Sequence, residues 1–386
     1  MIVLKKNAKN SLIFLFVFLT NISYAKNNLI IAGLLDFNVG LGKITYGLID
    51  QLSDEFLIDY YPSSIYSLDD DPYKISKKVH EIDVETLSNK QSGIFLYIES
   101  VQVLEEDDCY ENLSKDIIKY AYSMIESTML PAKAVEKLNT YFDAVIVPDK
   151  FLIDVYKNSG VTIPIICIPT GLYLDKFLLL SLKNNVGTPF VFGCVATRYE
   201  RKNLKKLITC FNDLYGNNKK YLLKIHAADY FQDGLLESLV KSLGAENIII
   251  SADVFDEDAY VEFMHSLDCY VLISKGEGFS NTPREAMAAG IPVIVSYNTG
   301  HSTLVDSGYV SAVECYAVEA DYQGFIKGVT SNKQFDCTYS DVKNALQNMI
   351  NNYSFYQKQR EKARNWVRHY SWQALKDSYT KLFNVR

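Results

Sequence analysis

The chain has 386 residues, of which 48% are hydrophobic and 22% are charged, so it can bury a large core and is not disordered. Its net charge of −7 argues against a general nucleic-acid-binding protein. The seven cysteines form no CxxC pair, which excludes a disulfide-rich scaffold and a paired-cysteine zinc site. At roughly 150 residues per domain, the length predicts two domains.

The first residues have the pattern of a targeting segment. Three lysines precede an apolar run at 12–19, and Ser23 and Ala25 provide the small-x-small pattern of a cleavage site. The uncharged stretch 10–25 is shorter than the ~20 residues that span a bilayer. Residues 1–26 are therefore predicted to be a signal peptide or an uncleaved anchor, and a mis-assigned start is a third explanation. Membrane contact is expected only through this segment.

The first half of the chain alternates short apolar runs with helical patterns. A Gly-rich turn, Asn38–Gly42, follows the first run and precedes a helical pattern. The predicted strands are 29–35, 94–98, 144–147 and 165–168, and the predicted helices include 115–125 and 133–141. Strands that alternate with helices of about ten residues indicate a parallel, doubly wound sheet.

The second half repeats this alternation, which predicts a second sheet of the same type. Its predicted strands are 190–195, 221–226, 248–250, 269–273 and 292–295, and its predicted helices are 203–214, 232–243, 257–266 and 283–289. A helical tail, 339–383, is broken near 369–371. The fold class is therefore α/β, with Rossmann-like domains at 27–180 and 181–365 and a C-terminal helix at 366–386.

A group of cations follows the strand that opens the second half. Arg198, Arg201 and Lys202 lie within five residues, between a strand and the start of a helix. Both their charge and the helix dipole favour a phosphate group at this place. The alternative is an ordinary solvated basic loop.

Two glutamates separated by seven residues form the second candidate site. Glu277 lies in a Gly-flanked loop, where the backbone can approach a ligand closely. Thr282, Pro283 and Glu285 match the first positions of a helix with a capping box, so helix capping is an alternative role for Glu285. Glu277 has no comparable structural role.

Other patterns carry less chemical information. The Gly-rich turn lacks the third glycine of a dinucleotide fingerprint, so a nicotinamide cofactor is not expected. Two D-x-D patterns occur, at 69–71 and 256–258, but the second opens a helix, where acidic residues favour the dipole. No metal site is therefore predicted. His226 is expected to pack within the protein rather than act as a base.

The segment 277–293 resembles the E-x7-E signature of retaining glycosyltransferases with the GT-B architecture, family 4 or group 1. The resemblance extends to Arg198–Asn203 and, in the first half, to 122–131, 142–148 and 169–171. It covers roughly residues 29–312. It implies two Rossmann-like domains facing across a cleft, with the C-terminal helix crossing back to the first domain.

The resemblance also implies a role for each site residue. Glu285 would bind the ribose of a sugar nucleotide, and Glu277 would lie against the donor sugar. Arg198 and Lys202 would hold the diphosphate and stabilise the leaving group in place of a metal. The remaining residues expected at the donor site are Gly40, Gly42, Gly278, Phe279 and Ser280. Ser280 replaces the glycine common in the family, so it could narrow the sugar pocket.

The function that the resemblance implies is transfer of a hexose, with retention, from a sugar nucleotide (UDP- or GDP-hexose) to a glycan or lipid-linked acceptor. The donor would be a substrate, and no further cofactor is expected. Glu126 and His301 are candidates to reach the cleft. The alternative is a non-catalytic or exported glycan-binding protein on the same scaffold. The catalytic body is expected to face the cytoplasm, and it would be exported if residues 1–26 are cleaved.

Overall fold

The computed structural model describes residues 26–35, 40–63, 75–183, 187–228, 234–322 and 332–384. Three features singled out in the sequence lie outside these residues. They are the targeting pattern at 1–25, the first residues of the Gly-rich turn (38–39) and the D-x-D pattern at 69–71.

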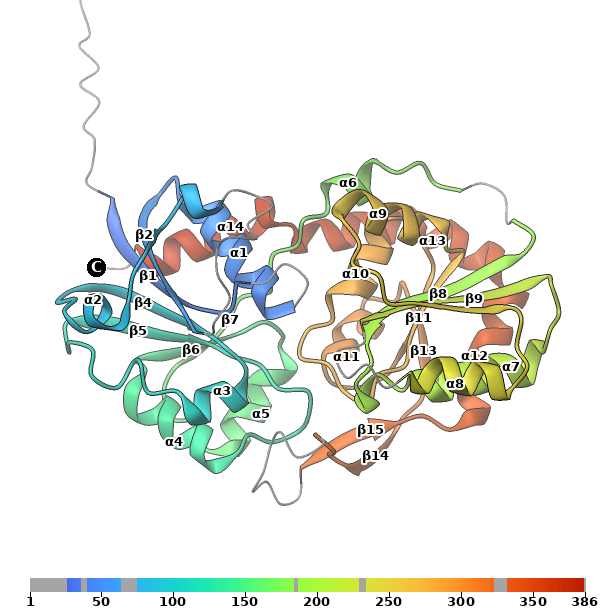
Figure 1. Ribbon diagram of the computed structural model, residues 1–386, viewed down its shortest axis with the longest axis horizontal. Helices are drawn as coiled ribbons and strands as arrows, with labels where there is room; N and C mark the ends of the chain where they lie inside the picture. The colour runs from blue at the N-terminus through green and yellow to red at the C-terminus, as the bar shows by residue number, and fades with distance from the viewer. Residues whose placement is uncertain are drawn as a thin grey trace, which may run out of the picture.

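Two parallel sheets lie side by side, one in each half of the chain (Figure 1). The first has the order β3-β2-β1-β4-β5-β6-β7, and the second β10-β9-β8-β11-β12-β13. The strands of the first sheet are β1 (Asn27–Gly33), β2 (Phe56–Pro62), β3 (His80–Glu81), β4 (Gly93–Ile98), β5 (Ile117–Tyr122), β6 (Ala144–Val147) and β7 (Ile165–Cys167). The strands of the second are β8 (Phe190–Thr197), β9 (Tyr221–Ala228), β10 (Ile248–Ser251), β11 (Cys269–Leu272), β12 (Val293–Ser296) and β13 (Ser311–Val313).

Helices connect the strands in both halves, as the alternating pattern predicts. In the first half they are α1 (Gly40–Leu52), the 3-10 turn η2 (Ile75–Lys77), α2 (Val84–Ser88), α3 (Val101–Glu106), α4 (Ala132–Tyr141), α5 (Phe151–Ser159) and α6 (Asp175–Leu179). In the second half they are η3 (Glu200–Lys202), α7 (Leu204–Tyr215), α8 (Leu235–Ser242), α9 (Glu257–Ser266), α10 (Asn281–Ala288), α11 (Thr299–Asp306), α12 (Tyr339–Asn351), α13 (Tyr353–Val367), η4 (Arg368–Tyr370) and α14 (Trp372–Phe383).

Strand order reverses at the same place in each sheet. β1 lies between β2 and β4, and β8 lies between β9 and β11, so successive connections run to opposite sides. Ligands of doubly wound folds bind beyond the carboxyl ends of the strands at such a reversal. The carboxyl ends of β8 and β11 are therefore the place to look for a site in the second half.

The helix predicted at 115–125 is wrong, because this segment contains β5. Its sequence, IIKYAY, is rich in β-branched and aromatic residues, and the strand pairs with β4 on one side and β6 on the other. Neighbouring polar residues produced a helix-like spacing, but pairing on both edges of the strand decides its conformation.

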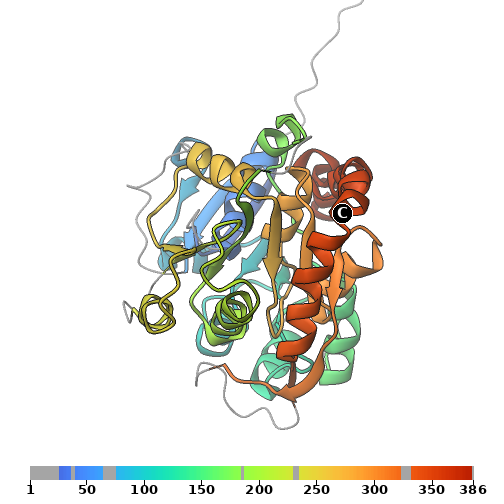
Figure 2. The same cartoon turned by 90° about the vertical axis from the view of Figure 1, so that its right-hand side faces the viewer.

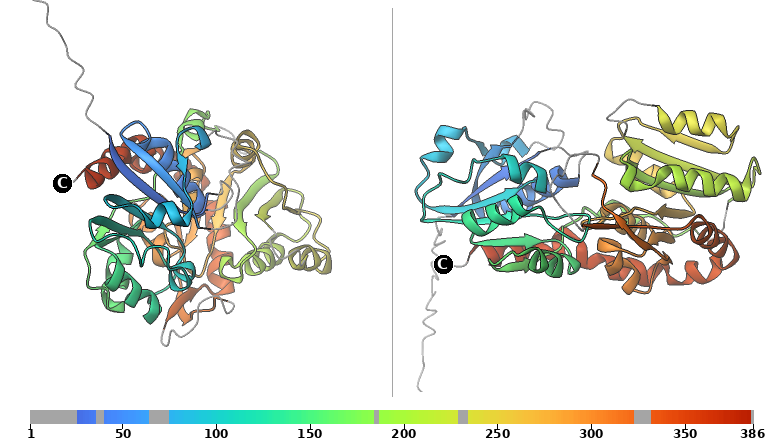
Figure 3. Two further views of the ribbon diagram at one scale, coloured as in Figure 1. Left: turned by 60° about the vertical axis from the view of Figure 1, so that its left-hand side comes forward. Right: turned by 90° about the horizontal axis from the view of Figure 1, so that it is seen from below.

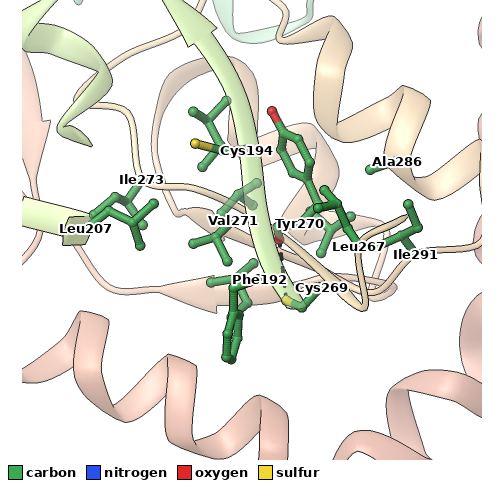
Figure 4. Packing of buried hydrophobic residues seen from close by; sticks show 14 of the residues in the cluster. Phe192, Cys194, Leu207, Leu267, Cys269, Tyr270, Val271, Ile273, Ala286 and Ile291 are labelled. Atoms are coloured by element: carbon green, nitrogen blue, oxygen red, sulfur yellow. Dashed lines mark hydrogen bonds between the residues drawn. The ribbon is translucent and has the colours of Figure 1, made fainter. Parts of the chain in front are cut away.

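The core of the second half buries β8 and β11 on both faces. Figure 4 shows Phe192, Val271 and Tyr270 packed with the thiols Cys194 and Cys269, all of them buried. Strands covered on both faces read as continuous apolar runs, which is the pattern seen in this sequence. These two cysteines behave as small hydrophobic residues.

The C-terminal helices α12 to α14 lie along one side of the molecule (Figure 2). α14 leaves the second half and packs into the core of the first, with Trp372, Tyr379 and Phe383 buried there. A Cβ atom on Gly47 or Gly171 would come within 2.2 Å of the Trp372 ring, so only glycine fits at either position.

A third, two-stranded sheet lies at the boundary between the halves (Figures 1 and 3). It is the antiparallel hairpin of β14 (Tyr316–Glu319) and β15 (Lys333–Asp336). None of the helices in the described parts of the chain combines the length and the apolar character needed to cross a membrane.

Candidate donor-binding site

Two turns of the second half meet at the edge of its sheet. Arg201 and Lys202 lie in η3, after the end of β8, while Glu277 lies in the loop after β11. β8 and β11 are parallel neighbours, so their carboxyl ends share one edge of the sheet. Side chains separated by 75 positions along the chain are thereby brought into contact.

Glu277 is buried and makes two ion pairs. Its Oε1 accepts a hydrogen bond from Lys202 Nζ at 2.6 Å, and its Oε2 lies 3.2 Å from an Arg201 nitrogen. Burial by itself raises the pKa of Glu277, but Lys202 and Arg201 lower it more strongly, to well below its usual value. The carboxyl group is therefore ionised at neutral pH.

The first half contributes a carboxylate to the same cluster. Glu126, a candidate from the sequence, follows β5 and pairs with Arg201 at 3.0 Å. A Cβ atom on Gly276 would lie 2.0 Å from the Glu126 carbonyl oxygen, and one on Gly278 would lie 2.7 Å from Met124 Sδ. The glycines therefore let the loop that carries Glu277 lie directly against the first half.

Glu285 is buried on α10, the helix that follows the loop carrying Glu277. It accepts a short hydrogen bond from the Tyr260 hydroxyl, and burial beside Glu285 raises the pKa of Tyr260 well above its usual value. Lys43 of α1 places its ammonium 5.2 Å from the centre of the Tyr260 ring. Glu285 therefore lies at the boundary between the two halves.

The capping box predicted for Thr282 and Glu285 is wrong. α10 begins at Asn281, and its N-cap is Ser280, whose side chain makes no capping hydrogen bond. The Thr282 hydroxyl instead contacts the Tyr270 hydroxyl at 2.6 Å. Helix capping, the alternative to ligand binding for Glu285, is therefore absent from this helix.

Arg198 is not brought to the Glu277 cluster. Its guanidinium makes two hydrogen bonds to Glu237 of α8, at 2.6 and 2.7 Å, and its Nε donates to the Ala227 carbonyl. β8 lies between β9 and β11, and Arg198 turns toward β9 whereas Arg201 and Lys202 turn toward β11. Arg201 is the cation that sequence reasoning left out of the site, although it belongs to the same group of three.

The remaining predicted residues occupy different places. Gly40 and Gly42 open α1 rather than lying in a loop, and Gly42 is buried. Phe279 is buried, and its ring stacks against the Arg284 guanidinium, 3.7 Å from the ring centre. Ser280 has a left-handed backbone (φ 71°), and its hydroxyl contacts His301 Nε2 at 2.9 Å.

Arg284 and Asp149 form a buried link that sequence reasoning missed. Arg284 is fully buried, hydrogen-bonds the carbonyls of Phe279 and Ser280, and lies 3.4 Å from Asp149 of the first half. Asp149 also accepts a hydrogen bond from Thr303 at 2.7 Å. The signal was present in the sequence as the one charged residue in the otherwise uncharged run between the two glutamates.

His301 lies at the start of α11 with both ring nitrogens engaged. Nε2 contacts Ser280, and Nδ1 contacts the Ser296 hydroxyl at 3.1 Å. Burial lowers the pKa of His301 to about 4, even though Glu277 favours the charged form. The imidazole is therefore neutral at pH 7. Its contact with the Ser280 hydroxyl holds that side chain beside the loop that carries Glu277.

We expect the stability of the protein to fall as pH drops from 7.5 to 5. In this range the unfolded chain binds a proton at His301, with an ordinary pKa near 6.5, whereas the folded chain with its pKa of about 4 does not. This difference in proton binding lowers the free energy of unfolding by about 2 kcal/mol between pH 7.5 and 5. Urea unfolding at several pH values measures it, and His301→Gln should flatten the profile. An equally steep profile for that variant would contradict the assignment.

Two other residues considered in the sequence have structural roles. His226 stacks on Phe255 with ring centres 3.8 Å apart, as expected for a packed histidine. Asp256 caps α9 through the Ala259 amide. Across the described ranges, no three His, Cys, Asp or Glu side chains are grouped so that they could hold a metal ion.

Residues 181–366 match the family model described as glycosyl transferases group 1. No curated protein matches the sequence. Among solved structures, HepE of Anabaena, determined in complex with UDP, matches with a TM-score of 0.69 at 12% identity, covering 92% of this chain and 99% of HepE.

Two further solved structures are similar over nearly their whole length. The sucrose-phosphate synthase of Thermosynechococcus elongatus has a TM-score of 0.70 at 13% identity, covering 93% of this chain and 98% of that one. The α,α-trehalose 6-phosphate synthase of Burkholderia multivorans has a TM-score of 0.63 at 9% identity, with the same coverage. The chain therefore has the GT-B fold of these glycosyltransferases, and its second half matches the glycosyl transferases group 1 family.

Proposed function

We propose that this protein is a retaining glycosyltransferase that moves a hexose from a sugar nucleotide to a glycan or lipid-linked acceptor. The observation that carries the proposal is the buried cluster of Glu277, Lys202 and Arg201 at the carboxyl ends of β8 and β11. It lies in the part of the chain that matches the family model. HepE, which has the same fold, was solved with UDP and with UDP-glucose.

In this proposal Glu285 and the three residues of the cluster act on different parts of the donor. Glu285 holds the ribose hydroxyls, and Glu277 lies against the donor sugar. Departure of the nucleoside diphosphate builds negative charge on phosphate oxygens, and fixed cations stabilise that charge. Lys202 supplies one such cation. The geometry favours Arg201 over Arg198 as the second, because Arg201 lies beside Lys202 and Glu277 whereas Arg198 turns away to Glu237 of α8.

Donor binding is tested by thermal shift with UDP-, GDP- and ADP-hexoses. A ligand that binds only the native state raises Tm, so the matching donor should give the largest rise. Glu285→Gln should weaken binding of that donor by about tenfold, because one charge-assisted hydrogen bond becomes neutral. The control is Glu361→Gln on the exposed face of α13.

Two results of this experiment would count against the proposal. No shift with any sugar nucleotide would favour the glycan-binding alternative, for which a shift with free oligosaccharide is the expected signature. An unchanged donor affinity for Glu285→Gln, together with a reduced kcat in a transfer assay, would remove the ribose-binding role from Glu285.

We expect transfer to proceed without a divalent metal, because Lys202 and Arg201 supply the positive charge that a metal would bring to the leaving group. Initial rates measured in excess EDTA should equal those in untreated buffer. Loss of transfer in EDTA that manganese or magnesium restores would overturn this expectation.

A further inference from the structure

Two cysteines bracket the β14–β15 hairpin. Cys315 directly precedes β14, and Cys337 directly follows β15. The register pairs Tyr316 with Asp336, so the two cysteines are the next residues at the base of the hairpin. Their sulfur atoms lie 3.3 Å apart, and both thiols are free. The hairpin therefore presents a ready pair of thiols at the point where its strands enter the second half.

The two thiols have different surroundings. Cys315 is half-buried, and its sulfur accepts a hydrogen bond from the Asn298 amide at 3.5 Å. The contact with Cys337 and that amide lower the pKa of Cys315, whereas the contact with Cys315 and burial raise the pKa of Cys337. Cys315 is thus the reachable sulfur with the greater thiolate character, and Cys337 lies fully buried behind it.

The hairpin also joins the second half to the first. Asn332 Oδ1 accepts hydrogen bonds from the Thr128 and Met129 amides at 3.1 and 3.0 Å. The Thr128 amide also donates to the Lys333 carbonyl at 3.1 Å, and the Tyr322 hydroxyl contacts Ser127 at 2.7 Å. These first-half residues directly follow Glu126, the partner of Arg201. The loop end of the hairpin, opposite the two cysteines, is therefore connected to the candidate donor site through a few hydrogen bonds.

A second path runs from Cys315 to Glu277. Asn298, which donates to the Cys315 sulfur, also accepts a hydrogen bond from the Thr299 hydroxyl at 2.9 Å. That hydroxyl in turn accepts one from the Glu277 amide at 2.8 Å. Three successive hydrogen bonds thus link the Cys315 sulfur to the backbone amide of Glu277.

We propose that Cys315 and Cys337 are a redox-active pair whose oxidation to a disulfide cross-links the base of the hairpin. The Cys315 thiolate attacks one sulfur of a disulfide oxidant, such as glutathione disulfide, and releases one thiol. Cys337 loses its proton and attacks the Cys315 sulfur, releasing the second thiol. The pair loses two electrons and two protons, and the oxidant gains them. The sulfur atoms need to approach by about 1.2 Å to reach bonding distance.

The test uses the full chain, incubated with glutathione disulfide or with dithiothreitol and then alkylated. Oxidation should remove two alkylatable thiols and lower the intact mass by about 2 Da. The tryptic peptides that contain Cys315 and Cys337 should appear as one species before reduction and as two after it. Closing this loop should also raise Tm by about 5 °C.

Three variants distinguish specific oxidation of Cys315 and Cys337 from random oxidation of the cysteines. Cys167→Ser, at another half-buried cysteine, should form the cross-link as the wild type does. Cys337→Ser should stop at a glutathione adduct of about 305 Da on Cys315. Cys315→Ser should form neither product, and because its site is half-buried it is informative even if the Cys337 variant does not fold. Retention of both thiols under oxidant, or cross-links through other cysteines, would overturn the proposal.

Discussion

Replacing Lys202 with alanine is expected to lower kcat for sugar transfer by about 100-fold or more, with a smaller change in KM. The ammonium lies 2.6 Å from Glu277 Oε1 at the carboxyl end of the second sheet, where the leaving diphosphate is proposed to bind. Removing one fixed group that stabilises charge developing in a transition state typically costs 100- to 1000-fold (~10²–10³) in kcat. Interactions made only in the transition state lower kcat, while uniform binding contacts raise KM.

Lys205→Ala is the matched control for this variant. Lys205 lies three positions further along, is half exposed, and pairs with Glu200 on the surface. Its loss should leave both kinetic constants near those of the wild type. Arg198→Ala provides a second comparison, because the structure assigns its guanidinium to Glu237. A larger loss of kcat for Arg198→Ala than for Arg201→Ala would contradict the proposed pair of cations.

Arg284→Met is expected to lower the free energy of unfolding by about 3–5 kcal/mol, because removing one partner of a buried ion pair leaves the other uncompensated. Both Arg284 and Asp149 are buried, and they join the two halves of the chain. The guanidinium also packs against the rings of Phe279 and Tyr370 and donates hydrogen bonds to two carbonyls of the candidate-site loop. Urea unfolding of the variant measures the loss.

A double-mutant cycle with Asp149→Asn isolates the pair itself. The double variant should lose less than the sum of the two single losses, because neither charge is then left buried alone. Lys343→Ala, which breaks an exposed ion pair with Asp213, should change stability by less than about 1 kcal/mol. Additive losses at Arg284 and Asp149 would show that the two side chains act independently.

The sequence alone was sufficient for the fold class and for most elements of the second half. Its strands are short apolar runs because both faces of a parallel sheet are covered, and they alternate with amphipathic helices of predictable length. The error at β5 has the same origin. A strand of six residues with mixed burial carries little periodic signal of its own, and its pairing with β4 and β6 lies outside the window that a pattern covers.

The sequence also singled out Lys202 and Glu277, two of the residues that the structure brings together. Cations after one strand and a glutamate in the loop after another can be read from strand order and composition. The sequence does not show which cation faces which carboxylate, because side-chain direction depends on the neighbouring strand. Arg198 turns toward β9 and meets Glu237, while Arg201 turns toward β11 and meets Glu277 and Glu126.

Only the tertiary structure decided the contacts that cross between the halves. Asp149 and Arg284 are 135 positions apart, and Ser127 and Tyr322 are 195 apart, so no local pattern links them. The same holds for Trp372 over Gly47 and Gly171, where a glycine that looks unremarkable in the sequence leaves the space for a ring. Local propensity and periodicity act over a few residues, whereas these pairs depend on how the two sheets and the returning C-terminal helix pack together.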